Sequence, residues 1–484
     1  MNAKILTRFT GTLLLIESVA FAVCFFVSLA YGDSDMSAFA VSFIISVTLG
    51  WLLRRYGDKT KVALTRHDSF VIVTFAWLAS TFVGTLPYIL SGTLPTFTDA
   101  FFETMSGFTT TGSTMIDDID SQPHGILFWR SVTNWVGGLG IVLFTLAILP
   151  SNGTGEIKLF AAEMTGPNKD KLHPRLKTTL HWLWSIYLLL TILCAVALYI
   201  AGMGKFDSIC HAFSTTATGG FSTHSKSIAF FHSPAIEYVE TIFMFLAGIN
   251  FSLLYALFFR RKFKMFLHNS ELKAYTLSVL LATAFISVCL YFYSGYNTSD
   301  SIREALFHVV SIGTSTGFTS SNFMQWIPAT WIVLLILMFA GACAGSTSGG
   351  FKMIRIVALF KITANEFKYI LHPNAVIPVR INRQVMNYSM EHTLIAFGTL
   401  YILTLVIGIL AFNIMGIPLM DAVGISMTSL GNSGPDIGKA YGMLNSWSGI
   451  PMAAKWLSSL MMLIGRLELF SIIILFTPRF WKDY

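Results

Sequence analysis

The chain of 484 residues is too apolar for a water-soluble domain: 54% of its residues are hydrophobic, 12% are charged and its mean hydropathy is +0.65. This composition is typical of a protein that lies mostly in a lipid bilayer. The net charge is +7, but Lys and Arg are scattered over short connectors rather than gathered on one face, which argues against nucleic acid as a partner. The five cysteines lie in apolar stretches without paired spacing, so we expect neither disulfides nor a CxxC metal site.

Ten apolar runs have roughly the 17–25 residues that a membrane-spanning helix needs. In chain order they cover residues 9–30, 36–53, 69–90, 125–149, 178–202, 234–259, 273–294, 328–359, 391–415 and 450–476. The first run follows Lys4 and Arg8, as the core of a signal peptide would. Because it is longer than a usual signal core, we expect a retained helix.

Basic residues favour one side of these runs. If the N-terminus is cytoplasmic, most Lys and Arg residues fall in cytoplasmic segments, above all in the connectors 54–66, 158–177, 260–273 and 352–383. We therefore expect both termini in the cytoplasm. The outer side carries an acidic cluster, Asp117, Asp118 and Asp120. This cluster is either a pore mouth that concentrates cations or a solvated loop, and its composition favours neither.

Four outer connectors are too long and too apolar for simple turns, and they resemble one another. They lie at about 93–124, 203–233, 297–327 and 417–449. Each begins with an acid suited to the start of a short helix and reaches a glycine 12 or 13 residues later. The acids are Asp99, Asp207, Glu304 and Asp421, and the glycines are Gly112, Gly219, Gly317 and Gly434. A unit of helix, re-entrant helix with loop, and helix is therefore repeated four times after residue 68.

The physics of the bilayer constrains these loops. Irregular backbone at membrane depth is tolerated only where protein or a water-filled cavity surrounds it, so the four loops should meet around one axis. Backbone carbonyl oxygens there can replace the hydration shell of a cation, and glycine permits positive φ or close approach. The stretch GFTTTGST, 107–114, supplies oxygens and no fixed charge. We expect a cation pore rather than an enzyme, since no nucleophile has a base and an orienting partner at workable spacing.

These motifs resemble the Trk/Ktr/HKT superfamily of potassium transporters over almost the entire chain. In that family one polypeptide folds four pseudo-equivalent units around a channel-like pore. The resemblance implies an all-α polytopic membrane protein with ten spanning helices and four re-entrant pore helices. It also implies that potassium is the transported ion and that four segments form its selectivity filter: Thr110, Thr111, Gly112 and Ser113; Ala217, Thr218, Gly219 and Gly220; Ser315, Thr316, Gly317 and Phe318; Asn432, Ser433, Gly434 and Pro435.

The fourth segment departs most from the pattern, because Asn432 and Ser433 stand where threonine is usual. The repeat divides the chain into two accessory N-terminal helices and four pore repeats. The accessory part is 1–67, and the repeats are 68–150, 151–260, 261–370 and 371–484.

The stretch GACAGSTSGGFK, 341–352, interrupts the eighth run. Its four glycines weaken a continuous helix by roughly 1 kcal/mol each. A phosphate-binding loop is excluded, because GxxxxGK[ST] is absent and an apolar helix precedes the stretch. Two interpretations remain: a close helix contact of small residues, or an unwound segment that obstructs the pore, as a loop at this place does in the resembled family. The gate would comprise the loop 341–350, with Gly345, Ser346, Thr347, Ser348, Gly349 and Gly350.

Arg466 is an ionisable residue deep in the last run. Such residues face a cavity or the bundle interior, so we expect it below the filter, where it would repel potassium and restrain the loop. Pairing with Glu468 is the alternative, but residues two apart project from different helix faces. We expect His211 and His308 to be packed hydrogen-bonding residues rather than metal ligands, and NWVGGLG, 134–140, to be a close helix contact.

Taken with the resemblance, these features lead us to expect potassium uptake across a bacterial inner membrane. The resemblance further implies a homodimer and a TrkA-like cytosolic nucleotide-binding ring, for which the basic connector 352–383 is a candidate docking surface. No NAD or ATP motif occurs, so we expect no organic cofactor in this chain. The rival hypothesis is a cation-coupled secondary transporter that works by alternating access, since such proteins also contain broken helices. Four repeats of one orientation favour the pore, but passive and proton-coupled flux stay equally open.

Overall fold

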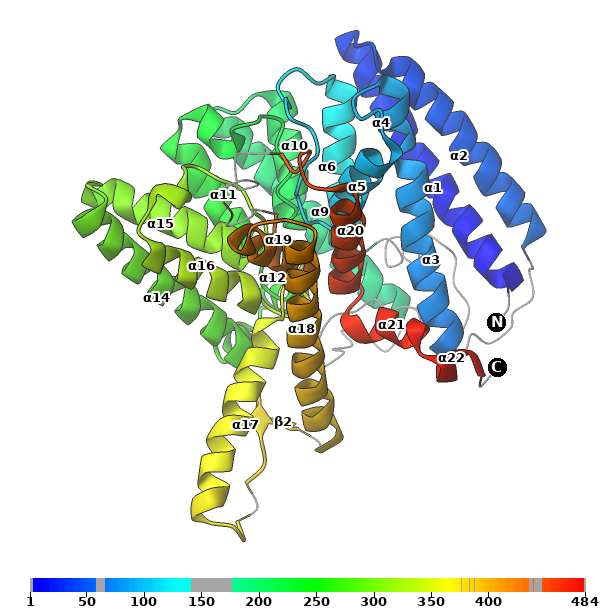
Figure 1. Ribbon diagram of the computed structural model, residues 1–484. Helices are drawn as coiled ribbons and strands as arrows, with labels where there is room; N and C mark the ends of the chain where they lie inside the picture. The colour runs from blue at the N-terminus through cyan, green and yellow to red at the C-terminus, as the bar shows by residue number, and fades with distance from the viewer. Residues whose placement is uncertain are drawn as a thin grey trace.

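The computed structural model describes residues 3–57, 66–140, 176–375, 377–382, 384–386, 388–434, 438 and 446–482, and it is mostly helical (Figure 1). In this described part, six helices are long and apolar enough to cross a membrane, or eight if each of two bent pairs is one span. The expected all-α polytopic membrane fold is therefore confirmed, whereas the count of ten spans stays a prediction. Pro435 and residues 141–149 of the fourth expected span lie outside the described residues.

The two N-terminal helices form a hairpin at one side of the molecule (Figure 1): α1 (Ala3–Tyr31) and α2 (Met36–Tyr56). They pack closely at two glycines, because a Cβ added to Gly11 would lie 2.7 Å from the carbonyl oxygen of Gly50. Small residues permit such contacts between helices in lipid. The turn of the hairpin is tied to the first repeat, since the Asp35 carboxylate accepts a hydrogen bond from the amide of Ile126 at 2.9 Å.

The remaining helices follow the fourfold repeat. The first repeat contains α3 (Arg66–Gly84), α4 (Leu86–Ser91), α5 (Phe97–Phe108) and α6 (His124–Gly138). The second contains α9 (Leu176–Ile200), α10 (Lys205–Ala217), η1 (Ser227–Phe231), α11 (Pro234–Ala247) and α12 (Phe251–Phe258). The third follows α13 (Phe263–Leu267) and contains α14 (Ser270–Tyr293), α15 (Thr298–Gly313), η2 (Phe323–Gln325), α16 (Pro328–Ala340) and α17 (Met353–Leu371). The fourth contains α18 (Tyr388–Ile414), α19 (Leu419–Gly431), α20 (Met452–Arg466), α21 (Leu469–Ile473), η3 (Ile474–Phe476) and α22 (Pro478–Lys482).

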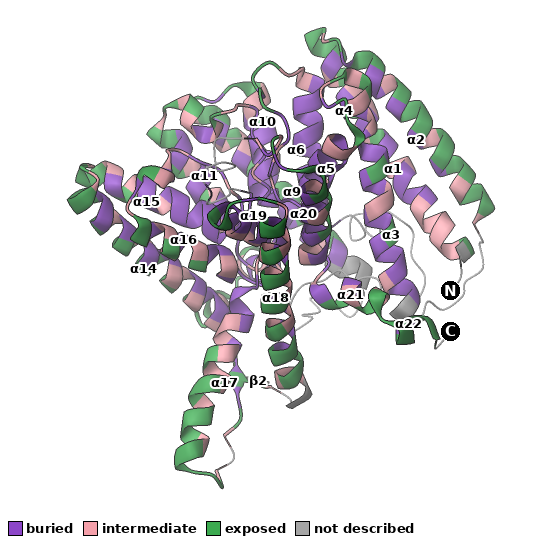
Figure 2. Ribbon diagram, viewed as in Figure 1, coloured by how far each residue is buried: buried purple, intermediate pink, exposed green. Residues whose placement is uncertain are grey.

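The four short helices α5, α10, α15 and α19 stand where re-entrant helices were expected. They are largely buried, whereas α17, α18 and the outer face of α2 are exposed (Figure 2). Asp99, Asp207 and Asp421 lie in the first turn of their helices, as the sequence pattern predicts. The prediction for Glu304 is wrong, because α15 begins at Thr298 and Glu304 lies near its middle. There the Glu304 carboxylate accepts hydrogen bonds from two serine hydroxyls of the following loop.

Two of the expected straight spans are bent, which corrects the prediction. The pair α11 and α12 turns by 101°, and α20 and the helices that follow it turn by 116°. The first bend follows from Asn250, which caps α12 by accepting a hydrogen bond from the amide of Ser252 at 2.8 Å. At the second bend Glu468 has a φ of 60°, which an α-helix does not permit. The break expected in the run 328–359 is confirmed, because α16 ends at Ala340 and α17 begins at Met353.

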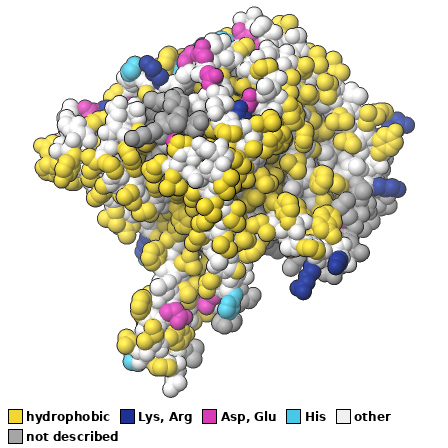
Figure 3. Space-filling model, in the orientation of Figure 1, with side chains coloured by type: hydrophobic (Ala, Val, Ile, Leu, Met, Phe, Trp, Pro, Cys, Tyr) yellow, Lys and Arg dark blue, Asp and Glu magenta, His cyan; other side chains and the backbone are white. Residues whose placement is uncertain are grey.

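The surface has the pattern of a protein that crosses a membrane. Figure 3 shows a band of hydrophobic side chains across the middle of the visible face and charged side chains toward its upper and lower ends. Both ends of the described chain lie on the side from which α17 projects (Figure 1). Next to α17, β1 (Arg380–Ile381) and β2 (Gln384–Val385) form a short antiparallel hairpin, in which Arg380 pairs with Val385.

Candidate functional site

The residues that follow the four short helices share one backbone conformation. We call residues 110–113, 217–220, 315–318 and 432–434 the glycine segments; Pro435, the last residue of the fourth expected segment, lies outside the described residues. Each has a non-glycine residue with positive φ, followed two positions later by a glycine with positive φ. The pairs are Thr110 (55°) with Gly112 (83°), Thr218 (53°) with Gly220 (73°), Ser315 (57°) with Gly317 (86°), and Asn432 (51°) with Gly434 (78°). Since a positive φ is unfavourable for threonine and serine, its fourfold recurrence indicates a geometry common to all four segments.

This conformation corrects the expected register of the second segment. The glycine that corresponds to Gly112, Gly317 and Gly434 is Gly220 and not Gly219. The number of residues from the first-turn acid Asp207 to Gly220 then equals the number from Asp99 to Gly112. Gly219 takes the place of Thr111, and its absent Cβ leaves room for the side chain of Asn134, whose amide group would lie 2.5 Å from it.

The glycine segments meet one another. A Cβ added to any of three of their glycines would crowd the carbonyl oxygen of a neighbouring segment, so the first and second, the second and third, and the fourth and first segments lie in close contact. These glycines and the residues whose carbonyls they approach are Gly112 with Gly219, Gly220 with Thr316, and Gly434 with Thr111. The Gly434 Cβ would also lie 3.5 Å from the Cα of Gly317. The four segments therefore follow one another in chain order around a ring that closes between the fourth and the first.

Hydroxyl groups hold the first and third glycine segments to their helices. The hydroxyl of Ser106 donates to the carbonyl of Ser113 at 2.6 Å, and Ser311 donates to the carbonyl of Phe318 at the same distance in the third repeat. Between the fourth and first segments, the Asn432 side-chain amide donates to the Thr111 hydroxyl at 3.0 Å. The unusual residue of the fourth segment thus makes a bond across the closure of the ring.

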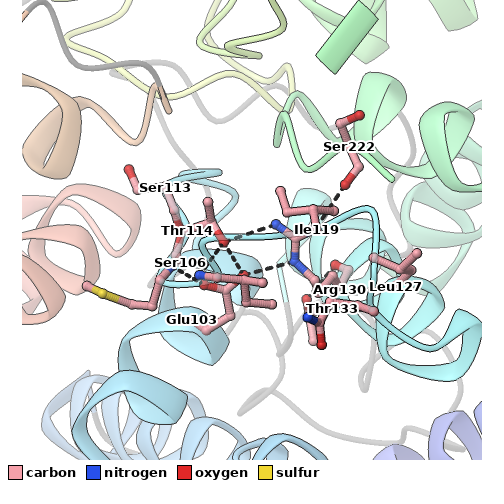
Figure 4. Close-up of polar contacts among 12 residues, drawn as sticks. Glu103, Ser106, Ser113, Thr114, Ile119, Leu127, Arg130, Thr133 and Ser222 are labelled. Atoms are coloured by element: carbon pink, nitrogen blue, oxygen red, sulfur yellow. Dashed lines mark hydrogen bonds and ion pairs between the residues drawn. The ribbon is translucent and has the colours of Figure 1, made fainter. Parts of the chain in front are cut away.

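Behind the first glycine segment lies a buried ion pair that the sequence analysis did not identify (Figure 4). Glu103 of α5 and Arg130 of α6 are 0% and 1% exposed, and Arg130 Nε lies 2.9 Å from Glu103 Oε1. The Glu103 carboxylate also accepts hydrogen bonds from the Thr114 hydroxyl at 2.9 Å and from the Met115 amide at 2.7 Å. It therefore holds the chain that leaves the first segment.

The same arginine reaches the second repeat. Its Nη1 donates to the carbonyl of Ser222 at 2.9 Å, and its guanidinium carbon lies 4.2 Å from the centre of the Phe221 ring. The signal available in the sequence was a charged residue in the interior of each of two apolar helices, which in a membrane marks a functional position. Arg130 therefore joins the chains that leave the first and second glycine segments.

All three residues of the outer acidic cluster are exposed, and the side chains of two of them bond to other repeats. Asp117 accepts hydrogen bonds from Ser446 and Ser448 of the fourth repeat, and these bonds lower its pKa below the usual value. Asp118 is exposed. Asp120 belongs to a contact with the second repeat, where His224 Nδ1 lies 2.7 Å from its Oδ1.

His224 lies between two acids, since its Nε2 is also 3.7 Å from Asp207 Oδ1. Burial alone would lower the pKa of His224, but the interactions with Asp207 and Asp120 outweigh it and raise that pKa. Burial would likewise raise the pKa of Asp120, yet hydrogen bonds from His224 and Ser225 lower it. Two of the three acids therefore connect outer loops of different repeats.

The two pore-helix histidines make the hydrogen bonds expected of packed residues. His211 Nε2 lies 3.0 Å from the Ser222 hydroxyl, and His308 Nε2 lies 3.2 Å from the carbonyl of Ser321. Each Nδ1 faces the carbonyl oxygen one helical turn earlier, of Asp207 and Glu304 respectively.

The loop 341–352 lies directly against the glycine segments. The amide of Gly349 donates to the Ser315 hydroxyl at 2.6 Å, and the hydroxyls of Ser348 and Ser315 are 3.1 Å apart. Thr347 donates to the carbonyl of Thr216 at 3.0 Å, so the loop also contacts the second repeat. Its backbone is irregular, and Gly345 and Gly350 have φ values of 74° and 76°.

Other backbone bonds tie this loop to the rest of the bundle. The amide of Gly350 donates to the carbonyl of Gly431 in the fourth repeat at 2.8 Å, and the carbonyl of Gly345 accepts from Phe251 at 3.0 Å. Within the loop, the Ser346 hydroxyl donates to the carbonyl of Cys343 at 2.6 Å. The loop therefore contacts three repeats through its own atoms.

Arg466 completes the contact with the remaining repeat. Its Nη1 donates to the carbonyl of Thr347 at 3.0 Å, and its Nη2 lies 2.6 Å from the carbonyls of both Gly137 and Gly138. The NWVGGLG stretch is a close helix contact, as expected, because a Cβ on Gly137 would overlap the carbonyl of Phe108. It also supplies carbonyl oxygens that bind this arginine, which the sequence analysis did not anticipate.

Two further side chains hold the loop. Glu271 Oε1 accepts hydrogen bonds from the amide of Ala344 at 2.6 Å and from that of Ile354 at 3.2 Å, which lie on either side of the Gly349-Gly350 pair. Lys352, which is 3% exposed, donates to the carbonyl of Ser348. Glu468 pairs with Arg355 at 2.6 Å.

Comparison with known proteins gives the family. A family model described as "TrkH: Cation transport protein" matches residues 35–483. Similar proteins include the Trk system potassium uptake protein TrkH of Escherichia coli (strain K12), which is 37% identical over 486 residues that cover 100% of both chains. TrkG of the same strain is 34% identical over 487 residues, covering 100% of this chain and 99% of the relative. Among solved structures, the crystal structure of the potassium transporter TrkH from Vibrio parahaemolyticus has a TM-score of 0.89 at 34% identity and covers 99% of this chain and 100% of that one.

These matches extend over the N-terminal hairpin, the four repeats, the glycine segments and the 341–352 loop. The chain therefore belongs to the TrkH family of cation transport proteins.

Proposed function

We propose that this protein takes up potassium through a pore whose selectivity filter is formed by the four glycine segments. The observation that carries the proposal is the closed ring, in which glycines with positive φ adjoin carbonyl oxygens of neighbouring segments. A ring of backbone carbonyls can replace the hydration shell of a potassium ion. The relatives named above are potassium uptake proteins, which supports potassium as the ion. Pro435 is included by its place in the sequence alone.

The loop 341–350 is proposed as the gate, with Arg466 as the residue that restrains it. The loop bonds directly to Ser315 of the third glycine segment, so in this conformation it stands against the proposed filter. Arg466 binds the loop at Thr347 and the first repeat at Gly137 and Gly138. Opening requires these bonds to be exchanged for others, and the positive charge disfavours a cation in the closed path.

The same proposal includes the location of the protein, the driving force for uptake and the partners. The protein would lie in a bacterial inner membrane with both termini in the cytoplasm, where the membrane potential drives potassium entry with about 2.3 kcal/mol per charge and 100 mV. A TrkA-like nucleotide-binding ring would bind on the cytoplasmic side, for which the projecting α17 and the adjoining hairpin are the proposed contact. We also propose that the protein forms a homodimer. Asp117, Asp118 and Asp120 would concentrate cations at the outer mouth of the pore.

Ion flux into liposomes tests this function. The purified protein is reconstituted without a partner, and potassium, rubidium, sodium and lithium are compared under an imposed voltage. Potassium and rubidium flux that follows the voltage without a proton or sodium gradient supports the pore. Flux that requires such a gradient supports the rival, a cation-coupled secondary transporter. In the same assay Gly112→Ser should reduce discrimination against sodium, and unchanged discrimination would remove Gly112 from the filter.

A further inference from the structure

A cavity of about 510 Å³ lies beside the pore domain, between the N-terminal hairpin and the first repeat. Its walls come from α1, α3 and α6, with Phe108 at the end of α5 and Phe213 of α10. This volume falls in the range of small-molecule sites in proteins. Val19 and Val23, on the α1 wall, are 61% and 46% exposed, so the cavity opens where lipid surrounds the helices.

One carboxyl group in this apolar lining is unexplained. Glu17 is 7% exposed, and in the described part of the chain neither of its carboxyl oxygens has a hydrogen-bond partner. The Ser80 hydroxyl, which also lines the cavity, lies close to the Glu17 carboxyl group without completing a hydrogen bond to it. Glu17 lies near the middle of α1 and hence near the centre of the bilayer, where an unsatisfied polar group is costly. A ligand that donates hydrogen bonds would remove this cost.

Among the described residues, no cation is hydrogen-bonded to Glu17. Arg54 is the one basic residue among the described residues that line the cavity, and its backbone lies beside Gly11, where an added Cβ would be 2.6 Å from the Arg54 amide. Gly11 and Glu17 are separated by about 9 Å along α1. At the Glu17 end the neighbour is instead Gly84 of α3, whose added Cβ would lie 3.3 Å from Glu17 Oε1.

We propose that this cavity is a binding site for a membrane-soluble primary amine, with the apolar body of the ligand among the aromatic side chains and its nitrogen at Glu17. A neutral amine reaches the cavity through the lipid, and the Glu17 carboxylic acid transfers its proton to the nitrogen. The O–H bond breaks as the new N–H bond forms, which leaves an ammonium and a carboxylate in contact. A primary ammonium has three N–H donors, enough for both carboxylate oxygens and the Ser80 hydroxyl.

An alcohol of the same length offers one donor and no charge, and a quaternary ammonium offers charge without a donor. The site should therefore bind a primary amine more tightly than an alcohol or a quaternary ammonium that carries the same alkyl chain. A ligand in this cavity would touch Phe108, the last residue of α5, and Trp129. The centres of these two rings are 6.1 Å apart.

The test uses the full-length protein in lipid nanodiscs and ¹⁹F NMR of a decylamine that carries a terminal trifluoromethyl group. Empty nanodiscs correct for partition into lipid. We expect saturable binding of one amine per chain, with the matching alcohol and trimethylammonium compound weaker by at least tenfold. Glu17→Gln should weaken amine binding about ten- to a hundredfold, because the charged hydrogen bonds are lost.

Two further variants keep the test decisive if Glu17→Gln does not fold. Ala20→Trp fills the cavity while retaining the carboxyl group and should abolish binding, and Ser80→Ala should weaken it severalfold. Glu240→Gln is the matched control, since Glu240 is a fully buried glutamate of α11 outside the cavity. This variant should bind the amine as tightly as the unaltered protein does. Equal binding of amine and alcohol, or unaltered binding in the Glu17 and Ala20 variants, would overturn the proposal.

Discussion

Replacement of Glu103 by Gln should weaken the support of the first glycine segment without changing its shape. The substitution leaves Arg130, which is 1% exposed, as a buried cation whose remaining contacts are neutral: a carbonyl, a hydroxyl and an aromatic ring. Removing one partner of a buried pair costs about 3–5 kcal/mol, because the other charge stays buried without compensation. The Met115 amide also loses a charged acceptor. We expect the apparent free energy of unfolding to fall by about 3 kcal/mol and discrimination between potassium and sodium to decrease.

A double-mutant cycle separates the pair from the general cost of altering a buried residue. Arg130→Met alone should be similarly destabilising, whereas the double variant should cost about 2–3 kcal/mol less than the sum of the two single variants. Unfolding is followed by titration with sodium dodecyl sulfate in detergent micelles, and selectivity by liposome flux. Glu240→Gln is again the control, because Glu240 is equally buried but bonds to a neutral threonine hydroxyl. Additive costs within about 0.5 kcal/mol would refute the reasoning.

Three further predictions concern the segments, the loop and the outer contacts. Gly220→Ser should abolish potassium selectivity because its Cβ overlaps the Thr316 carbonyl, whereas Gly92→Ser, at a similar φ of 78° with open space around it, should retain selectivity; equal effects in liposome flux would contradict the ring. Arg466→Ala should raise basal flux in folded protein, and unaltered or lower flux would argue against a gate there. The stabilising contact of His224 with Asp120 should be fully present between pH 3.8 and pH 6.5, the ordinary pKa values of aspartate and histidine, and be lost as pH rises through the higher folded pKa of His224. It should also weaken as pH falls through the folded pKa of Asp120, which is below 3.8. Thermal unfolding between pH 5 and 8 checks this, and His224→Ala should lose that pH dependence.

The sequence was most informative where one local pattern recurred. The four polar, glycine-bearing connectors predicted the segments that the structure brings together, and the cluster of glycines in 341–352 predicted the break between α16 and α17. The register of the second segment was predicted wrongly at Gly219, although the spacing of 13 residues from Asp99 to Gly112 and from Asp421 to Gly434 favours Gly220. The backbone angles decide between the two neighbours, since of this pair only Gly220 has positive φ.

Long-range pairing was beyond the same reasoning. Glu103 and Arg130 are 27 residues apart and on different helices, so no helical spacing relates them. The bends after α11 and α20 were missed because the spans were predicted from the apolar character of whole runs. One capping residue such as Asn250 hardly changes that average. The partners of Arg466 were likewise not predictable, since they are backbone carbonyls, which every residue possesses.

The central claim is that the four glycine segments enclose one path for potassium ions, and the location of bound ions tests it most directly. Crystals of the protein grown in a thallium salt, with thallium as an anomalous scatterer in place of potassium, would show where such ions bind. The account predicts anomalous peaks on the axis of the ring, at the level of the carbonyl oxygens of Thr111, Gly219 and Thr316, that disappear when thallium is replaced by lithium. Peaks located only outside the ring, or none in it under conditions that support flux, would contradict the account.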